Sequence, residues 1–88
     1  MNKPTDEMID ELYSVLLSLK TKQDCIDLLE DLCTHKEVEN MAQRICAARL
    51  IEKGETYNQV IEKTGISSAT LARVSNCVKY GKGYKKFL

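Results

Sequence analysis

The chain has 88 residues, enough for one small domain, and its 13 acidic and 13 basic side chains leave no formal net charge. It shows neither a signal-peptide pattern nor an apolar run near the ~18 residues that cross a membrane, so we expect a cytoplasmic protein without a membrane partner. The neutral total hides an asymmetry, since residues 1–40 carry 10 acids against 4 bases and residues 41–88 carry 3 acids against 9 bases. A basic half favours nucleic acid as a partner, and an acidic half favours a different task such as association.

Three helices are predicted in the first part of the chain, and each begins at a threonine that can act as an N-cap. They span residues 5–20, 21–33 and 34–54. Apolar side chains recur at three- and four-residue steps along them: Met8, Ile9, Leu12, Val15, Leu16 and Leu19 in the first helix, and Val38, Met41, Ala42, Ile45, Ala48 and Ile51 in the third. Nothing in the chain suggests a strand, so we expect a single all-α domain over residues 1–88.

The first helix is more apolar than a monomer needs. Tyr13 and Leu17 lie off its main apolar stripe and would be exposed to water in a single chain. This excess favours a homodimer, with residues 1–54 as the N-terminal dimerisation helices. The alternative is that these are ordinary surface residues, because isolated apolar side chains on a surface need no partner.

Residues 56–79 predict two short helices joined by a tight turn, which is the pattern of a helix-turn-helix. Thr56 and Gln59 have the spacing of a capping box. Gly65 stands where the chain leaves the first helix in a left-handed conformation, and Ser67 or Ser68 begins the second helix. Residues 80–88 form either a short helix or a frayed tail.

The outer face of the second helix favours DNA. Its side chains are small, polar or basic, and the chain contains no acid after Glu62. We expect Ser68, Ala69 and Ala72 to face bases. The full set of candidate DNA contacts is Asn58, Ser67, Ser68, Ala69, Thr70, Ala72, Arg73, Asn76 and Lys79. The alternative is a helical protein-interaction module whose basic face binds an acidic protein partner.

No residue pattern predicts catalysis, a metal site or a cofactor. The four cysteines, Cys25, Cys33, Cys46 and Cys77, include no C-x-x-C pair, and there is one histidine. Since each cysteine lies among apolar residues, we expect buried free thiols. No paired carboxylates and no set of nucleophile, histidine and acid stand at a recognisable spacing, so we do not expect an enzyme.

The segment SATLARVSNCVKYG, preceded by GETYNQVIEKTG and MAQRICAARLIEKG, resembles the Trp repressor family, and most closely its small YerC/YecD type. The residues that match the family's ATxxRxSNxxK pattern are Thr70, Arg73, Ser75, Asn76 and Lys79. The resemblance implies a Trp-repressor-like helical domain and an intertwined homodimer. It also implies a transcriptional repressor that binds double-stranded DNA at an inverted-repeat operator.

The resemblance also implies a ligand slot. In the family an amino acid lies between the recognition helix and the long central helix, and the matching positions here are Thr34, Arg44, Thr70 and Arg73. Two arginines from different helices can clamp an anion. The chain has Val74 where the family's repressor has a glycine and Cys77 where it has a serine, so we expect no binding of tryptophan as a corepressor. Either another anion binds in the slot, or Arg44 and Arg73 make structural or phosphate contacts.

Overall fold

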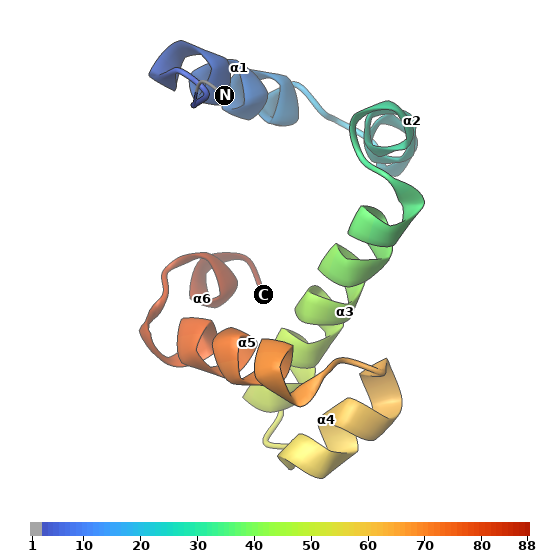
Figure 1. The fold of residues 1–88 in the computed structure, drawn as a ribbon, viewed down its shortest axis with the longest axis vertical. Coiled ribbons are helices and arrows are strands. Elements are labelled where there is room, and N and C mark those ends of the chain that lie inside the picture. Colours follow the sequence, from blue (N-terminus) through green and yellow to red (C-terminus); the bar gives the residue numbers. More distant parts are fainter. Residues whose placement is uncertain (1–2) are drawn as a thin grey trace. The chain divides into compact units, whose positions relative to one another are not determined.

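The computed structural model describes residues 3–88, and over these residues the chain forms α-helices and no strand (Figure 1). The helices are α1 (Asp6–Leu17), α2 (Lys22–Leu32), α3 (His35–Glu52), α4 (Tyr57–Thr64), α5 (Ser68–Tyr80) and α6 (Gly83–Phe87). The prediction of an all-α fold is confirmed. The last nine residues form a short helix, which is one of the two alternatives left open by the sequence.

Threonine caps start α1 and α2 as predicted. The Oγ1 of Thr5 accepts a hydrogen bond from the amide of Met8 at 3.2 Å, and that of Thr21 accepts one from the amide of Asp24 at 3.0 Å. However, α1 ends at Leu17, three residues before the predicted end at Lys20. Ser18 is the C-cap, and its hydroxyl donates to the carbonyl of Val15 at 2.6 Å, one of the last carbonyls of the helix.

The chain divides into two compact units, Met1–Thr34 and His35–Leu88. Across the described residues of the first unit, 3–34, no side chain is buried, and Leu17 of α1 is 86% exposed. The apolar stripe predicted on the first helix therefore has no core to enter within its own unit. Helix α3 belongs to the second unit, and the assignment of residues 1–54 as dimerisation helices stays a prediction.

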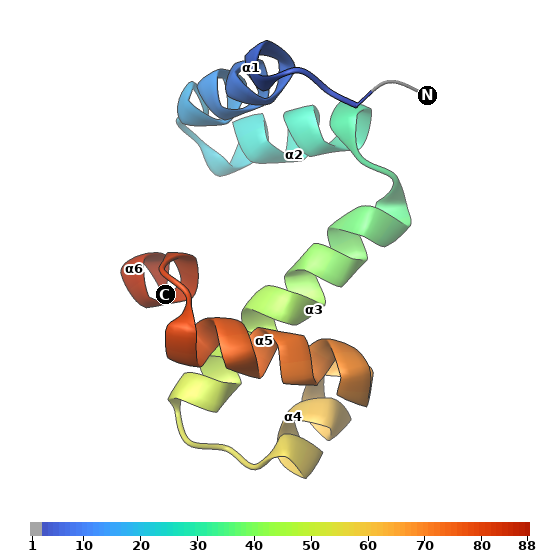
Figure 2. The ribbon, with the colours of Figure 1, turned by 60° about the vertical axis from the view of Figure 1, so that its left-hand side comes forward.

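The core of the second unit lies where α3, α4 and α5 meet (Figures 1 and 2). It consists of Ala47 and Ala48 from α3, Val60 from α4, Ile66 from the following turn, and Leu71 and Val74 from α5. Two adjacent alanines allow the backbones of α4 and α5 to approach α3 closely, because their side chains add little bulk. This packing sets the position of α5, which both views show crossing the C-terminal half of α3.

The predicted apolar stripe of α3 was partly wrong. Ala48 is buried as expected, but Ile45 is 45% exposed and Ala42 is exposed, while Ala47 is fully buried. Successive helical residues are rotated by about 100°, so Ile45 and Ala47 point in nearly opposite directions. The core lies on the Ala47 side, which apolarity alone did not reveal.

The cysteines are free as predicted, but the prediction that they are buried was wrong. Cys46 is exposed, and Cys25, Cys33 and Cys77 are half-buried. Cys46 precedes the buried pair of alanines on α3 and is exposed, and α2, which carries Cys25, has no buried residue. Among residues 3–88, no group of three or more His, Cys, Asp or Glu side chains could hold a metal ion, and no helix is long and apolar enough to cross a membrane.

Candidate nucleic-acid interface

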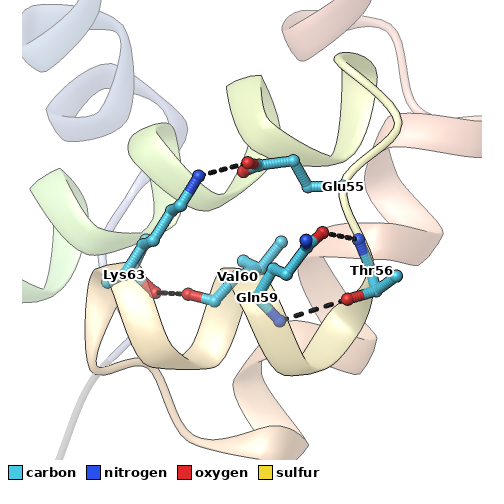
Figure 3. Close-up of polar contacts among 6 residues, drawn as sticks. Glu55, Thr56, Gln59, Val60 and Lys63 are labelled. Atoms are coloured by element: carbon cyan, nitrogen blue, oxygen red, sulfur yellow. Dashed lines mark hydrogen bonds and ion pairs between the residues drawn. The ribbon is translucent and has the colours of Figure 1, made fainter.

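The capping box fixes the start of α4. The Oγ1 of Thr56 accepts from the amide of Gln59 at 3.3 Å, and the amide of Thr56 donates to Oε1 of Gln59 at 2.8 Å (Figure 3). Lys63 forms an ion pair with Glu55 and so ties the last turn of α4 to the loop before the helix (Figure 3). Both ends of this short helix are thereby held, and the predicted capping box is confirmed.

The turn between α4 and α5 depends on one glycine. Gly65 has φ of 73°, a left-handed conformation that side chains with a Cβ rarely adopt, and its amide donates to the carbonyl of Ile61 at 2.9 Å. Gln43 of α3 donates from Nε2 to the carbonyl of Thr64 at 3.2 Å. Ile66 then enters the core. The turn is therefore fixed on α3 by both a hydrogen bond and an apolar contact.

A second link joins α4 directly to α5. The phenol of Tyr57, in the first turn of α4, donates to the hydroxyl of Ser75. Ser75 is 3% exposed and is the one buried polar side chain in the part of the chain that the structure describes. The sequence singled out Ser75 only as part of a family pattern and missed its partner. The sequence feature that could have indicated the burial of Ser75 is its position directly after Val74, on a helix face that is otherwise apolar.

The candidate DNA contacts on α5 lie on one exposed face. Ser67 caps the helix by accepting from the amide of Thr70 at 3.2 Å. Of the predicted contacts, those that are exposed are Ser67, Ser68, Ala69, Ala72, Arg73, Asn76 and Lys79, together with Asn58 on α4. Thr70 is half-buried, and its hydroxyl lies 2.9 Å from the hydroxyl of Ser67, which donates to it. The opposite face carries Leu71 and Val74 into the core.

Two cavities border this helix. The larger, of about 590 Å³, lies between α3, α5 and α6 and is lined by Arg44, Arg73, Val74, Cys77, Gly81, Lys82, Gly83, Tyr84 and Phe87. The smaller, of about 280 Å³, is lined by Lys36, Asn40, Gln43, Arg44, Gly65, Ile66, Ser67 and Thr70.

The cavities bring together most of the predicted slot residues. Arg44 and Arg73 share the larger cavity, Arg44 and Thr70 share the smaller one, and Thr34, the last residue of the first unit, lines neither. Sequence reasoning missed the residues that α6 and the preceding loop contribute, Lys82, Tyr84 and Phe87. No local pattern shows that a five-residue helix folds back against α5.

Comparison with known proteins identifies the family. The family model described as Trp repressor protein matches residues 7–88. The uncharacterised protein YerC of Bacillus subtilis (strain 168) is 38% identical over 81 residues, which cover 92% of this chain and 78% of YerC.

Two crystal structures share the fold. A candidate Trp repressor from Staphylococcus aureus has a TM-score of 0.87 and 32% identity, over 92% of this chain and 82% of its own. A TrpR-like protein from Eubacterium eligens ATCC 27750 also has a TM-score of 0.87, with 36% identity over 91% of this chain and 84% of its own. These matches agree with the order of the helices and with the capped helix-turn-helix described above. The chain belongs to the Trp repressor family and, within it, to the YerC type.

Proposed function

We propose that this protein is a sequence-specific DNA-binding regulator of transcription that represses from an inverted-repeat operator, with α5 as its recognition helix. The observation that supports the proposal most directly is the exposed face of α5. Its side chains are small, polar or basic, whereas the opposite face of the helix packs in the apolar core. Membership of the Trp repressor family supports it.

The chemistry of this face suits the major groove. Ser68, Ala69 and Ala72 are short, so the backbone of α5 can approach the base edges. Arg73 can donate two hydrogen bonds to a guanine or a phosphate, and Lys79 supplies a further cation at the C-terminal end of the helix. No carboxylate follows Glu62 in the chain, so nothing on α5 repels the phosphate backbone.

A homodimer would supply the second recognition helix. The argument for it is the first unit, where large apolar side chains are exposed in a single chain: Met8, Ile9, Leu12, Tyr13, Val15, Leu16, Leu17, Ile26 and Leu32. An apolar surface of this extent favours association with a second copy. Two recognition helices about 34 Å apart would meet one face of the duplex one helical turn apart, which requires an inverted repeat.

The larger cavity carries a second part of the proposal. Arg44 and Arg73 both line it, as do Val74 and Cys77, the two departures from the family's repressor. The added volume of Val74 narrows the space for an indole, and a thiol accepts poorly from an ammonium group. We therefore propose that tryptophan is not the effector and that any anion held there is a different one.

A salt titration tests DNA binding. We expect the affinity of the wild type for a duplex to fall linearly with log salt concentration, as counterions are released from phosphates. Arg73→Ala should weaken binding of the selected site at least tenfold with the fold intact, because the side chain is exposed. Arg49→Ala removes a second exposed arginine that lines neither cavity and should leave affinity unchanged. If the wild type showed no measurable affinity for duplex DNA but bound an acidic protein, the proposal would be contradicted.

A further inference from the structure

The smaller cavity is lined on one side by a row of polar side chains from α3. Lys36, Asn40 and Arg44 follow one another at steps of four residues, so they share one face of that helix. The other side of the cavity is the α4–α5 turn and the first turn of α5, at Ser67 and Thr70. The row thus borders the N-terminal end of α5, which is the end of a recognition helix that contacts the base edges in the major groove.

The lining groups favour an oxyanion. Two of them are cationic and none is a carboxylate. Among the described residues, the ion pairs of His35 with Glu39 and of Lys63 with Glu55 involve neither Lys36 nor Arg44. An ammonium and a guanidinium that face one cavity without a counter-charge attract an anion and can donate several hydrogen bonds to it.

The remaining polar groups are mostly occupied. Gln43 donates to the carbonyl of Thr64 at 3.2 Å, and the hydroxyls of Ser67 and Thr70 bond to each other at 2.9 Å. The amide of Thr70 already donates to Ser67. The hydroxyl of Ser67 and the amide of Thr70 are therefore occupied, and the charged donors of the cavity lie in the α3 row of Lys36, Asn40 and Arg44.

We propose that the α3 row binds a phosphate oxyanion in the smaller cavity, and that this phosphate belongs to the DNA backbone beside the bases that α5 reads. The proposal rests on the proposed function and extends its interface from α5 to the N-terminal half of α3. Lys36 and Asn40, which the sequence did not single out, become phosphate contacts. Such contacts fix the register of the protein on the duplex without reading sequence.

Two variants test the row without disturbing the larger cavity, which Lys36 and Asn40 do not line. Lys36→Ala should weaken binding of a selected duplex and of a random duplex by the same factor, about 3- to 10-fold, and should lower the salt slope by about one. Asn40→Ala should weaken both duplexes with the slope unchanged. Lys53→Ala, which removes another exposed lysine that lines neither cavity, is the matched control and should change nothing.

Inorganic phosphate distinguishes a DNA phosphate from a free one. We would titrate it into the wild type and follow the backbone amide signals of Gly65, Ser67 and Thr70 by NMR. A saturable shift that Lys36→Ala abolishes and that bound duplex prevents supports the DNA assignment. A shift that persists beside bound duplex overturns it, because the cavity then holds a free phosphate.

The result for Lys36→Ala separates this inference from the proposed function. If the variant binds both duplexes with wild-type affinity and slope, the α3 row is not a phosphate contact, although DNA binding by α5 stands. If the wild type binds no duplex at all, the proposed function fails together with the DNA assignment. Circular dichroism of each variant confirms that the exposed substitutions leave the helices intact.

Discussion

Removal of the Tyr57 hydroxyl tests a partly buried hydrogen bond between the two helices of the helix-turn-helix. Tyr57→Phe keeps the ring and deletes only the hydrogen bond to Ser75. A typical hydrogen bond contributes about 1 kcal/mol net, and a buried hydroxyl left without a partner costs about 1–3 kcal/mol. Ser75 is 3% exposed, but Tyr57 is 49% exposed, so water reaches one side of the bond and the lower end of that range applies.

We therefore expect Tyr57→Phe to lower the free energy of unfolding by about 1 kcal/mol. For a domain of this size that corresponds to a fall in Tm of about 4–8 °C. Thermal melts followed by circular dichroism, at one fixed protein concentration, measure the change. The fixed concentration matters because the Tm of a dimer depends on it.

The controls separate the hydrogen bond from the ring. Tyr80→Phe removes a hydroxyl from a tyrosine that is 79% exposed and should leave Tm unchanged. Ser75→Ala combined with Tyr57→Phe should cost less than the two single changes added together, since both variants delete the same bond. A Tyr57→Phe melt within about 1 °C of the wild type, or strictly additive losses in the double variant, would refute the reasoning.

Three further predictions concern the turn, the dimer and the effector. Gly65→Ala should lower Tm by several degrees, because the φ of 73° strains any residue with a Cβ by about 1 kcal/mol. The added methyl group itself would fit, since it would lie at an ordinary contact distance of 3.5 Å from Gln43. An unchanged Tm would contradict this prediction. Leu12→Asp should unfold the protein, because Leu12 is 40% exposed in one chain and the proposed dimer would bury it, so that the aspartate would be a buried, unpaired carboxylate. Sedimentation of the wild type as a monomer at low micromolar concentration would contradict the dimer. L-tryptophan should give no measurable heat of binding, whereas a dissociation constant below about 0.1 mM that Arg44→Ala abolishes would restore a tryptophan corepressor.

Local signals in the sequence predicted the helix-turn-helix well. The capping box at Thr56 and Gln59, the left-handed Gly65 and the cap at Ser67 depend on residues within four positions of one another. The energetics of such caps and turns are set by the neighbouring backbone, so a pattern of a few residues is enough.

Features that depend on packing between distant segments were not predictable in the same way. The burial of Ala47 in place of Ile45 depends on which side of α3 receives α5, and the Tyr57–Ser75 bond joins residues 18 positions apart. In the candidate site, the spacing of the apolar residues in α5 predicted which face of this helix is exposed. The positions of Lys82 and Lys36 in the walls of the two cavities were not predictable, because they depend on how the helices pack together.

The central claim, that α5 reads base sequence, is tested most directly by the affinity of a Ser68→Glu variant for duplexes selected from random DNA with the wild type. We expect the wild type to bind an inverted repeat at least about 1,000-fold more tightly than a scrambled duplex. Ser68→Glu places a carboxylate against base and phosphate acceptors and should lose that preference. Affinity of Ser68→Glu for the selected site within about threefold of the wild type would contradict the assignment of α5 as the recognition helix.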